Sequence, residues 1–180
     1  MKSLSIIILF LLFSEICFSQ DNCDSIIYWN KSYKLKCSDF RGEDRDTNKY
    51  IVAISMIEIR SKGFRSNNLP NYKIFVVFHR STSWNTDTTC SILTHEQLHF
   101  DMAEYFARKL RKQIAELRQN QNSEIQNYSN IIANIYKEWT QEVNKYDQET
   151  FHGESKSKQE EWNEKIANDM EELKNYEVNY

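Results

Sequence analysis

The sequence is poor in residues that interrupt helices. Its 180 residues include one proline and three glycines, the two residue types least compatible with a helix interior. The four cysteines form no Cys-x-x-Cys pair, which argues against a zinc site built from thiolates. The formal net charge is -3, so the overall charge favours neither a nucleic acid nor an anionic membrane as a partner.

The sequence also lacks an apolar run of membrane-spanning length. The apolar segment near its start, Leu4 to Phe13, has ten residues, whereas a spanning helix needs about 20. Lys2 precedes this segment, and Cys17 to Ser19 follows it with small residues at the positions that a signal peptidase reads. We therefore predict that residues 1–19 are a signal peptide. The mature chain should be secreted or periplasmic, with no stable membrane insertion.

The mature chain, residues 20–180, has the length of a single globular domain and shows no internal repeat. It retains Cys23, Cys37 and Cys90 in a compartment where disulfides persist. These three cysteines allow one bridge and one free thiol, and the sequence leaves the pairing open. Because Asn22 precedes Cys23, this cysteine lacks the small neighbour typical of a bacterial lipoprotein.

The first part of the mature chain has the composition of β-strands. Ile51 to Ile59 is rich in β-branched residues, and Tyr72 to His79 reads Tyr-Lys-Ile-Phe-Val-Val-Phe-His. Gly63 and the run from Asn67 to Asn71 supply turn residues between these segments. We therefore predict two antiparallel neighbours. An extended piece around Tyr28 to Cys37 predicts a third strand.

From about Thr89 onward, apolar residues recur at steps of three and four, which predicts helices. The apolar positions are Leu93, Met102, Phe106, Leu110, Ile114 and Leu117 for the first helix, Ile125, Tyr128, Ile132, Tyr136, Trp139 and Val143 for the second, and Trp162, Ile166, Met170, Leu173 and Tyr176 for the third. Threonines can cap the first helix, and Gly153 separates the second from the third. The sequence therefore predicts an α+β fold, with a small antiparallel sheet followed by one long helix and two further helices.

The stretch His95-Glu96-Gln97-Leu98-His99 matches the HExxH pattern. Residues four apart lie about 40° apart around a helix, so both imidazoles can reach one metal ion. Glu96 is rotated by about 100° from His95 and can address a water on that ion. In zinc hydrolases this pattern supplies two metal ligands and a general base. We therefore expect His95 and His99 to bind Zn²⁺, with Glu96 as the base.

A catalytic zinc ion generally has three protein ligands and one open position. The two remaining histidines are His79, at the end of a predicted strand, and His152, after the second predicted helix. Glu149 is an alternative, because a glutamate from a later helix often serves as the third ligand. Asp101 and Glu104 lie about 200° and 140° around the helix from the second motif histidine, so they point away from the metal. They suit the orientation of an imidazole N–H better than ligation.

Four segments share the pattern of a known family. They are Leu93 to Glu104 with its continuation Ala107 to Arg111, Leu35 to Gly42, Ser83-Trp84, and Tyr146 to Gly153. In these segments the chain resembles a bacterial family of predicted secreted zinc-dependent proteases, largely catalogued as a domain of unknown function. The resemblance implies a zincin-like fold. It also implies that His152 is functional, because this histidine falls within the last segment. Cys37 stands where the family often has tryptophan.

The motif and the resemblance together predict an exported zinc-dependent peptidase that hydrolyses an amide bond in a peptide or protein substrate. His95, His99 and His152 would hold the zinc ion, which lowers the pKa of a bound water. Glu96 would accept the proton of that water and pass it to the leaving amine.

Three further expectations concern the surroundings of the site. Tyr146 is a candidate for stabilising an oxyanion, and the strand from Tyr72 to His79 is a candidate for pairing with an extended substrate. Asp147 or Asp101 could hold a ligand imidazole in one tautomer. The alternative to an enzyme is an exported non-catalytic zinc-binding or protein-interaction module, which would have no use for Glu96 as a base.

Overall fold

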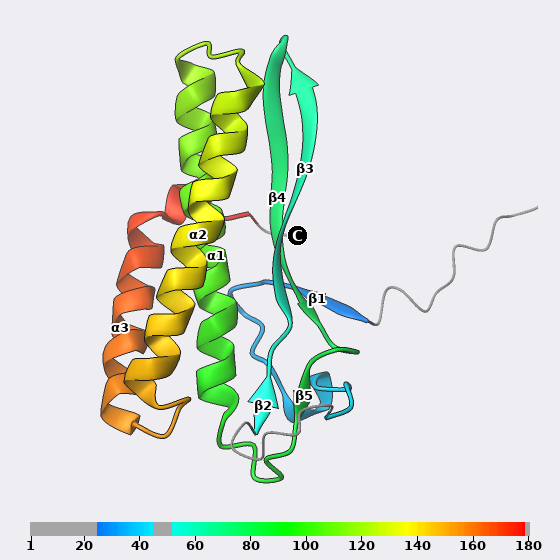
Figure 1. Ribbon diagram of the computed structural model, residues 1–180, viewed down its shortest axis with the longest axis vertical. Coiled ribbons are helices and arrows are strands. Elements are labelled where there is room, and N and C mark those ends of the chain that lie inside the picture. Colours follow the sequence, from blue (N-terminus) through cyan, green and yellow to red (C-terminus); the bar gives the residue numbers. More distant parts are fainter. Residues whose placement is uncertain (1–24, 45–51, 179–180) are drawn as a thin grey trace, which may run out of the picture.

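The computed structural model describes residues 25–44 and 52–178. The predicted signal peptide and Cys23 lie outside these residues. The elements follow the order β1 (Ile26–Tyr28), the 3-10 helix η2 (Cys37–Asp39), β2 (Ala53–Ile54), β3 (Ile57–Ser66), β4 (Leu69–His79), β5 (Trp84–Asn85), α1 (Leu93–Gln119), α2 (Ile125–Thr150), α3 (Lys156–Glu172) and the 3-10 helix η3 (Lys174–Tyr176). A long twisted hairpin lies beside a layer of three helices, and a second small sheet lies at one end of the molecule (Figure 1).

The larger sheet has the strand order β1-β4-β3, and both pairs of strands are antiparallel. β3 and β4 form a hairpin in which Ser66 pairs with Leu69 across Asn67-Asn68. Both asparagines have positive φ, 52° and 62°, as a two-residue hairpin turn requires. The predicted antiparallel neighbours are confirmed, but the predicted strand from Ile51 to Ile59 is divided in the structure. Ala53–Ile54 forms β2, which pairs with β5, and only Ile57 to Ile59 pairs with β4, in a strand that continues to Ser66. Gly63, however, lies inside β3 opposite Tyr72 and takes no part in the turn.

The core lies between the large sheet and the helices, and α1 is at its centre. α1 packs against β3 and β4 and also against α2 and α3. Along β4, Ile74, Val76 and Phe78 are buried at alternate positions, because successive side chains of a strand point to opposite faces. They join a cluster that includes Phe100 and Phe106 of α1. This packing fixes the HExxH helix between the sheet and the other two helices.

The predicted α+β fold, with antiparallel strands followed by three helices of which the first is long, is confirmed. α1 begins at Leu93, later than the periodicity from about Thr89 indicated. The carboxylate of Asp87 holds the preceding turn, where it accepts hydrogen bonds from Thr89, Ser91 and the N–H of Ile92. The expected threonine cap is wrong, because the N-cap residue is Ile92 and it makes no side-chain cap.

The third strand is β1, which ends at Tyr28, where the predicted extended piece began. Trp29 continues the contact with the sheet through its N–H, which donates to the carbonyl of Val76 at 2.9 Å. Its buried indole N–H donates to Asp101 of α1 at 2.8 Å. The chain therefore leaves the strand at Trp29, because this side chain is held against α1.

Cys37 and Cys90 form a disulfide, which connects η2 to the turn before α1. This bridge settles the pairing that the sequence left open for these two cysteines. Disulfides persist in oxidising compartments, so the bridge favours an extracytoplasmic location. Within the described part of the chain, every helix is too short or too polar to cross a membrane.

Candidate metal centre

The HExxH segment forms the first turns of α1 and presents both imidazoles to α2. The Nε2 atoms of His95 and His99 lie 3.1 Å apart, and the two rings are nearly perpendicular, at 87°. His95 is 3% exposed, and the side chain of His99 is 14% exposed. The convergence that the sequence predicts for the two imidazoles is therefore present in the fold.

Asp147 brings a carboxylate from α2 to the same point. Its Oδ1 atom lies 3.2 Å from Nε2 of His95 and 3.0 Å from Nε2 of His99. The two nitrogens are 3.1 Å apart, so the three donor atoms form a nearly equilateral triangle. The oxygen is buried and has no hydrogen-bond partner of suitable geometry among the described residues. Such an oxygen calls for another partner, because leaving a buried carboxylate oxygen unsatisfied is costly.

The donor set fits a zinc ion. Imidazole nitrogens and carboxylate oxygens bind zinc at about 2.0–2.2 Å, so neighbouring ligand atoms of a tetrahedral site lie about 3.3 Å apart. The spacings observed between the three donor atoms, 3.0 to 3.2 Å, are close to that value. One ion of this size can therefore contact all three atoms.

His152 reaches this point through a left-handed turn at the end of α2. Phe151, His152 and Gly153 have φ values of 49°, 52° and 88°. Positive φ is uncommon in residues other than glycine and is often found at functional sites. The ligand atom of His152 lies within 4.8 Å of those of His95 and Asp147. His152 is exposed, so it lies at the rim of the donor set.

Gln159 of α3 orients the ring of His95. Its Oε1 atom lies 3.2 Å from Nδ1 of His95 and accepts the hydroxyl of Tyr146 at 2.8 Å. Because a carbonyl oxygen only accepts hydrogen bonds, Nδ1 carries the hydrogen and Nε2 presents its lone pair. The amide nitrogen of Gln159 donates to Asn163 at 2.9 Å, which fixes the amide. Metal-binding histidines are commonly held in this way.

Charges near the donor atoms outweigh the effect of burial. Burial lowers the pKa of His99, but its contact with Asp147 and the negative charges of Glu96 and Asp147 raise this pKa above its ordinary value. Burial raises the pKa of Asp147, yet the two histidines bring it well below its usual range. Asp147 is therefore ionised, which is the form that binds a cation.

Glu96 faces a cleft of about 600 Å³, which the donor residues also line. Glu96 is 4% exposed. Its carboxylate makes neither a hydrogen bond nor an ion pair with any described residue. Glu96 is therefore a buried carboxylate without a partner, beside the candidate metal donors, and it can accept a proton from a molecule in the cleft.

Two of the alternative ligands lie elsewhere in the structure. Glu149 accepts the indole N–H of Trp162 at 2.9 Å, on a different face of α2 from Asp147. His79, at the end of β4, has its Nε2 atom 3.0 Å from a carboxylate oxygen of Glu58. Neither side chain joins the donor set.

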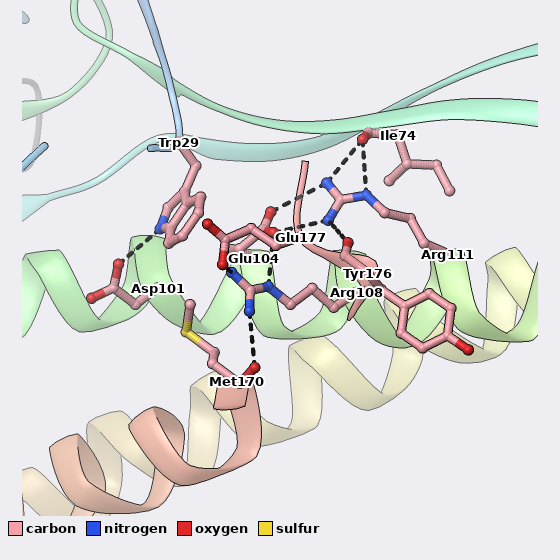
Figure 2. A network of polar contacts seen from close by, with 9 residues as sticks. All are labelled: Trp29, Ile74, Asp101, Glu104, Arg108, Arg111, Met170, Tyr176 and Glu177. Atoms are coloured by element: carbon pink, nitrogen blue, oxygen red, sulfur yellow. Dashed lines mark hydrogen bonds and ion pairs between the residues drawn. The ribbon is translucent and has the colours of Figure 1, made fainter. Parts of the chain in front are cut away.

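Asp101 and Glu104 point away from the donor set, as predicted, but they orient no imidazole. Asp101 accepts the indole N–H of Trp29. Glu104 forms ion pairs with Arg108 and Arg111 in a buried network on another side of α1 (Figure 2). The role predicted for these two carboxylates belongs to the glutamine of α3.

Two predicted contacts with a substrate are wrong. The side chain of Tyr146 is buried and its hydroxyl is hydrogen-bonded within the core, so this group cannot serve an oxyanion. β4 pairs with β3 from Leu69 to Phe78 and with β1 from Val77 to His79. On its remaining edge, the carbonyl of Ile74 accepts from the guanidinium of Arg111, and that of Val76 accepts from Trp29. β4 therefore has no free edge there for a peptide.

The structure adds direct roles for two residues. The sequence indicated Asp147 only as a support for an imidazole, whereas its oxygen contacts both histidines. Gln159 is absent from the site that the sequence predicts. In the sequence, Gln159 lies three residues before Trp162 and seven before Ile166. It therefore falls on the apolar stripe of the third helix. A polar residue on such a stripe indicates a buried hydrogen-bonding role.

Gly153→Ala should destabilise the fold by about 1–3 kcal/mol and weaken metal binding. A Cβ atom at Gly153 would lie 2.9 Å from Cδ1 of Ile92 and 3.0 Å from Cβ of His95, at a positive φ that disfavours side chains. Urea unfolding and a zinc titration measure the two effects. The control is Gly63→Ala, where the three nearest atoms to the new Cβ would belong to the ring of Tyr72 and zinc affinity should not change. An unchanged zinc affinity in Gly153→Ala would contradict the close packing against His95.

Residues 78–153 match the model of a family described as "Bacterial protein of unknown function (DUF922)". The matched segment runs from the end of β4 to Gly153 and contains the HExxH motif, Asp147 and His152. No curated protein and no solved structure gives a significant match. The resemblance to a bacterial family of unknown function is confirmed over this segment, and the match carries no activity with it.

Proposed function

We propose that the chain is an exported zinc-dependent peptidase with Glu96 as its general base. One observation carries the proposal. Donor atoms of His95, His99 and Asp147 lie 3.0 to 3.2 Å from one another, beside a buried carboxylate that has no partner and faces a cleft of about 600 Å³. A purely structural zinc site needs neither a base beside it nor an open cleft.

The proposed ligands are His95, His99 and Asp147. Asp147 takes the third position because its oxygen contacts both imidazoles. His152, the third ligand predicted from the sequence, is exposed, and its ligand atom lies within 4.8 Å of those of His95 and Asp147. It is close enough to be the competing ligand, and its contribution can be measured.

Each side chain of the site has its own role in hydrolysis. Zinc, when bound, would polarise the scissile carbonyl and lower the pKa of a water. Glu96 accepts the proton of the attacking water and delivers it to the leaving amine. Gln159 holds His95 in the tautomer whose Nε2 atom is free to bind. Tyr146 stacks on the same imidazole, with ring centroids 4.6 Å apart, and limits its rotation.

The test is a metal analysis of the purified mature chain together with cleavage of a broad peptide library. We expect one zinc ion per chain, cleavage of at least one class of peptide, loss of cleavage with a chelator and recovery when zinc is returned. Stoichiometric zinc without any cleavage would contradict the proposal. That result would favour the non-catalytic zinc-binding module.

Asp147→Asn should weaken zinc binding by more than about a hundredfold, because even residues that only orient ligands account for about 10–100-fold. His152→Ala should weaken it by about tenfold at most. Competition with a chelating dye at fixed pH measures both affinities. Glu149→Gln is the control on the same helix and should bind zinc like the unchanged protein. A larger loss in His152→Ala than in Asp147→Asn would make His152 the third ligand.

A further inference from the structure

The cleft in front of the metal donors extends along α2. Trp139, Val143 and Asp147 follow one another at steps of four on this helix, and all three line the cleft. At 1.5 Å per residue, Trp139 and Val143 lie about 12 Å and 6 Å from Asp147 along the helix axis. Glu154 lines the cleft beyond the other end of α2. The donor atoms therefore lie between two ends of the same cleft.

The two ends differ in chemistry. The end formed by Trp139 and Val143 is apolar, and the indole N–H of Trp139 is a buried donor without a hydrogen-bond partner among the described residues. The other end carries Asp87, from the turn before α1, and Glu154, from the turn after α2. These two connections lie at the same end of the molecule (Figure 1).

The acidic end has no neutralising cation among the described residues. Neither Asp87 nor Glu154 forms an ion pair there, and the described lining of the cleft includes no lysine or arginine. Hydrogen bonds from Thr89 and Ser91 hold the pKa of Asp87 well below its usual range, so it is ionised. The remaining titratable groups that line the cleft are Glu96, Asp147 and the three histidines.

Buried polar atoms without partners also indicate that this cleft receives a ligand. The oxygen Oδ1 of Asp147, the hydroxyl of Ser55 and the indole nitrogen of Trp139 have no hydrogen-bond partner in the described structure, and all three residues line the cleft. Such atoms are rare in native proteins and call for an explanation. Glu96, 4% exposed, adds a carboxylate without a partner at the same place. Asp147 and Glu96 together balance the charge of a divalent ion, so Asp87 and Glu154 determine the net charge of the cleft.

We propose that the cleft selects peptides with an apolar side chain on one side of the scissile bond and a cationic side chain on the other. The apolar side chain packs at Trp139 and Val143, and the cationic one lies near Glu154 and Asp87. Complementary charge favours a lysine or arginine at the acidic end and disfavours a carboxylate. This inference rests on the proposed function, because it uses the same metal donors and base.

Peptide binding can be measured without turnover in the zinc-loaded Glu96→Gln variant. The probes are N-acetylated, C-amidated peptides with phenylalanine at one position and lysine, glutamine or glutamate at another, in both orders and at several spacings. For at least one order, we expect the lysine peptide to bind about tenfold more tightly than the glutamate peptide. The difference should shrink at high salt, because ions screen charges near solvent. Equal affinities for all three peptides at low salt would overturn the proposal.

Charge reversal at the acidic end tests whether this end causes the preference for lysine peptides. Glu154→Lys, made in the same variant, should abolish or reverse the preference for lysine. Glu160→Lys makes the same change of charge at an exposed position of α3 that does not line the cleft, and it should keep the preference. An equal loss in both variants would show that overall charge, and not this end of the cleft, discriminates among peptides.

The apolar end is tested with Trp139→Ala and with Val143→Thr, which nearly preserves the shape of valine. Both should lower the affinity for phenylalanine peptides several-fold and leave peptides with alanine at that position unchanged. Zinc content and thermal unfolding confirm that the variants are folded. If Trp139→Ala unfolds, Val143→Thr alone decides, and an unchanged phenylalanine preference there would contradict the assignment of this end.

The binding assay separates failure of this inference from failure of the proposed function. Discrimination among peptides by the Glu96→Gln variant, without cleavage by the unchanged protein, would support the cleft assignment and contradict a peptidase. Cleavage by the unchanged protein without preference for charge would support the peptidase and contradict the cleft assignment.

Discussion

Glu96→Gln should keep zinc bound while lowering kcat for peptide hydrolysis by at least about a hundredfold, as expected for loss of a general base. Glutamine has nearly the same shape but cannot accept a proton from water. Since the carboxylate of Glu96 pairs with no described residue, its replacement removes no hydrogen bond or ion pair from the described structure. Steady-state kinetics on a peptide cleaved by the unchanged protein, with zinc content measured on the same sample, gives both results.

The matched control is Glu116→Gln, an exposed change on the same helix. It should retain both zinc and full activity. Loss of zinc in Glu96→Gln would mean that this carboxylate supports the metal site. Full activity in Glu96→Gln would exclude Glu96 as the base and contradict the proposed mechanism.

Glu104→Gln should lower the free energy of unfolding by about 3–5 kcal/mol, the cost of breaking a buried ion pair by removing one partner. Glu104 is 1% exposed and accepts from Nε of Arg108 at 3.0 Å and from Nη1 of Arg111 at 2.8 Å (Figure 2). Without its charge, the buried Arg108 has only Glu177 as an ionised partner among the described residues. For a slope of about 2 kcal/mol per molar urea, the unfolding midpoint should fall by about 2 M.

The same substitution in an exposed pair provides the control. Glu138→Gln removes the ion pair with Lys109, whose side chains are 46% and 26% exposed. Because solvent screens such a pair, its loss should cost less than about 1 kcal/mol. Similar losses of stability in the two variants would contradict the energetic importance of the buried network in Figure 2.

Local periodicity explains why much of the fold could be predicted. The alternation of β4 and the three- and four-residue steps of the helices depend on neighbours along the chain. Boundaries were less accurate where a side chain ended an element. Asp87 delays the start of α1 by holding the preceding turn, and Trp29 ends β1 by binding to Asp101. The partner of Trp29 is distant in the sequence, so no local pattern reveals it. The partners of Asp87 lie two to five residues away and belong to turn chemistry, which hydrophobic periodicity does not register.

In the candidate site, too, some features follow from local spacing in the sequence and others from contacts between elements. The spacing of His95 and His99 places both imidazoles on one face of any helix that they share, so this pair follows from the sequence. The late segment Tyr146 to Gly153 was also identified, but the sequence ranked His152 above Asp147. In the structure Asp147 contacts Nε2 of both motif histidines, because it lies on the face of α2 that packs against α1. His152 lies beyond the end of this helix, in the left-handed turn.

The sequence by itself determined the α+β architecture, the helix that carries HExxH and the pair of imidazoles on one side of it. These properties arise from the fixed geometry of helices and strands. Only the tertiary structure decided that Asp147 and Gln159 meet His95, that Cys37 pairs with Cys90, and that Glu104 lies in a separate buried network. The contacts of Asp147 and Gln159 with His95, and of Cys37 with Cys90, join parts of the chain that are distant in the sequence. Glu104 pairs with Arg108 and Arg111 of its own helix, and the burial of this network depends on how the helices pack around the core.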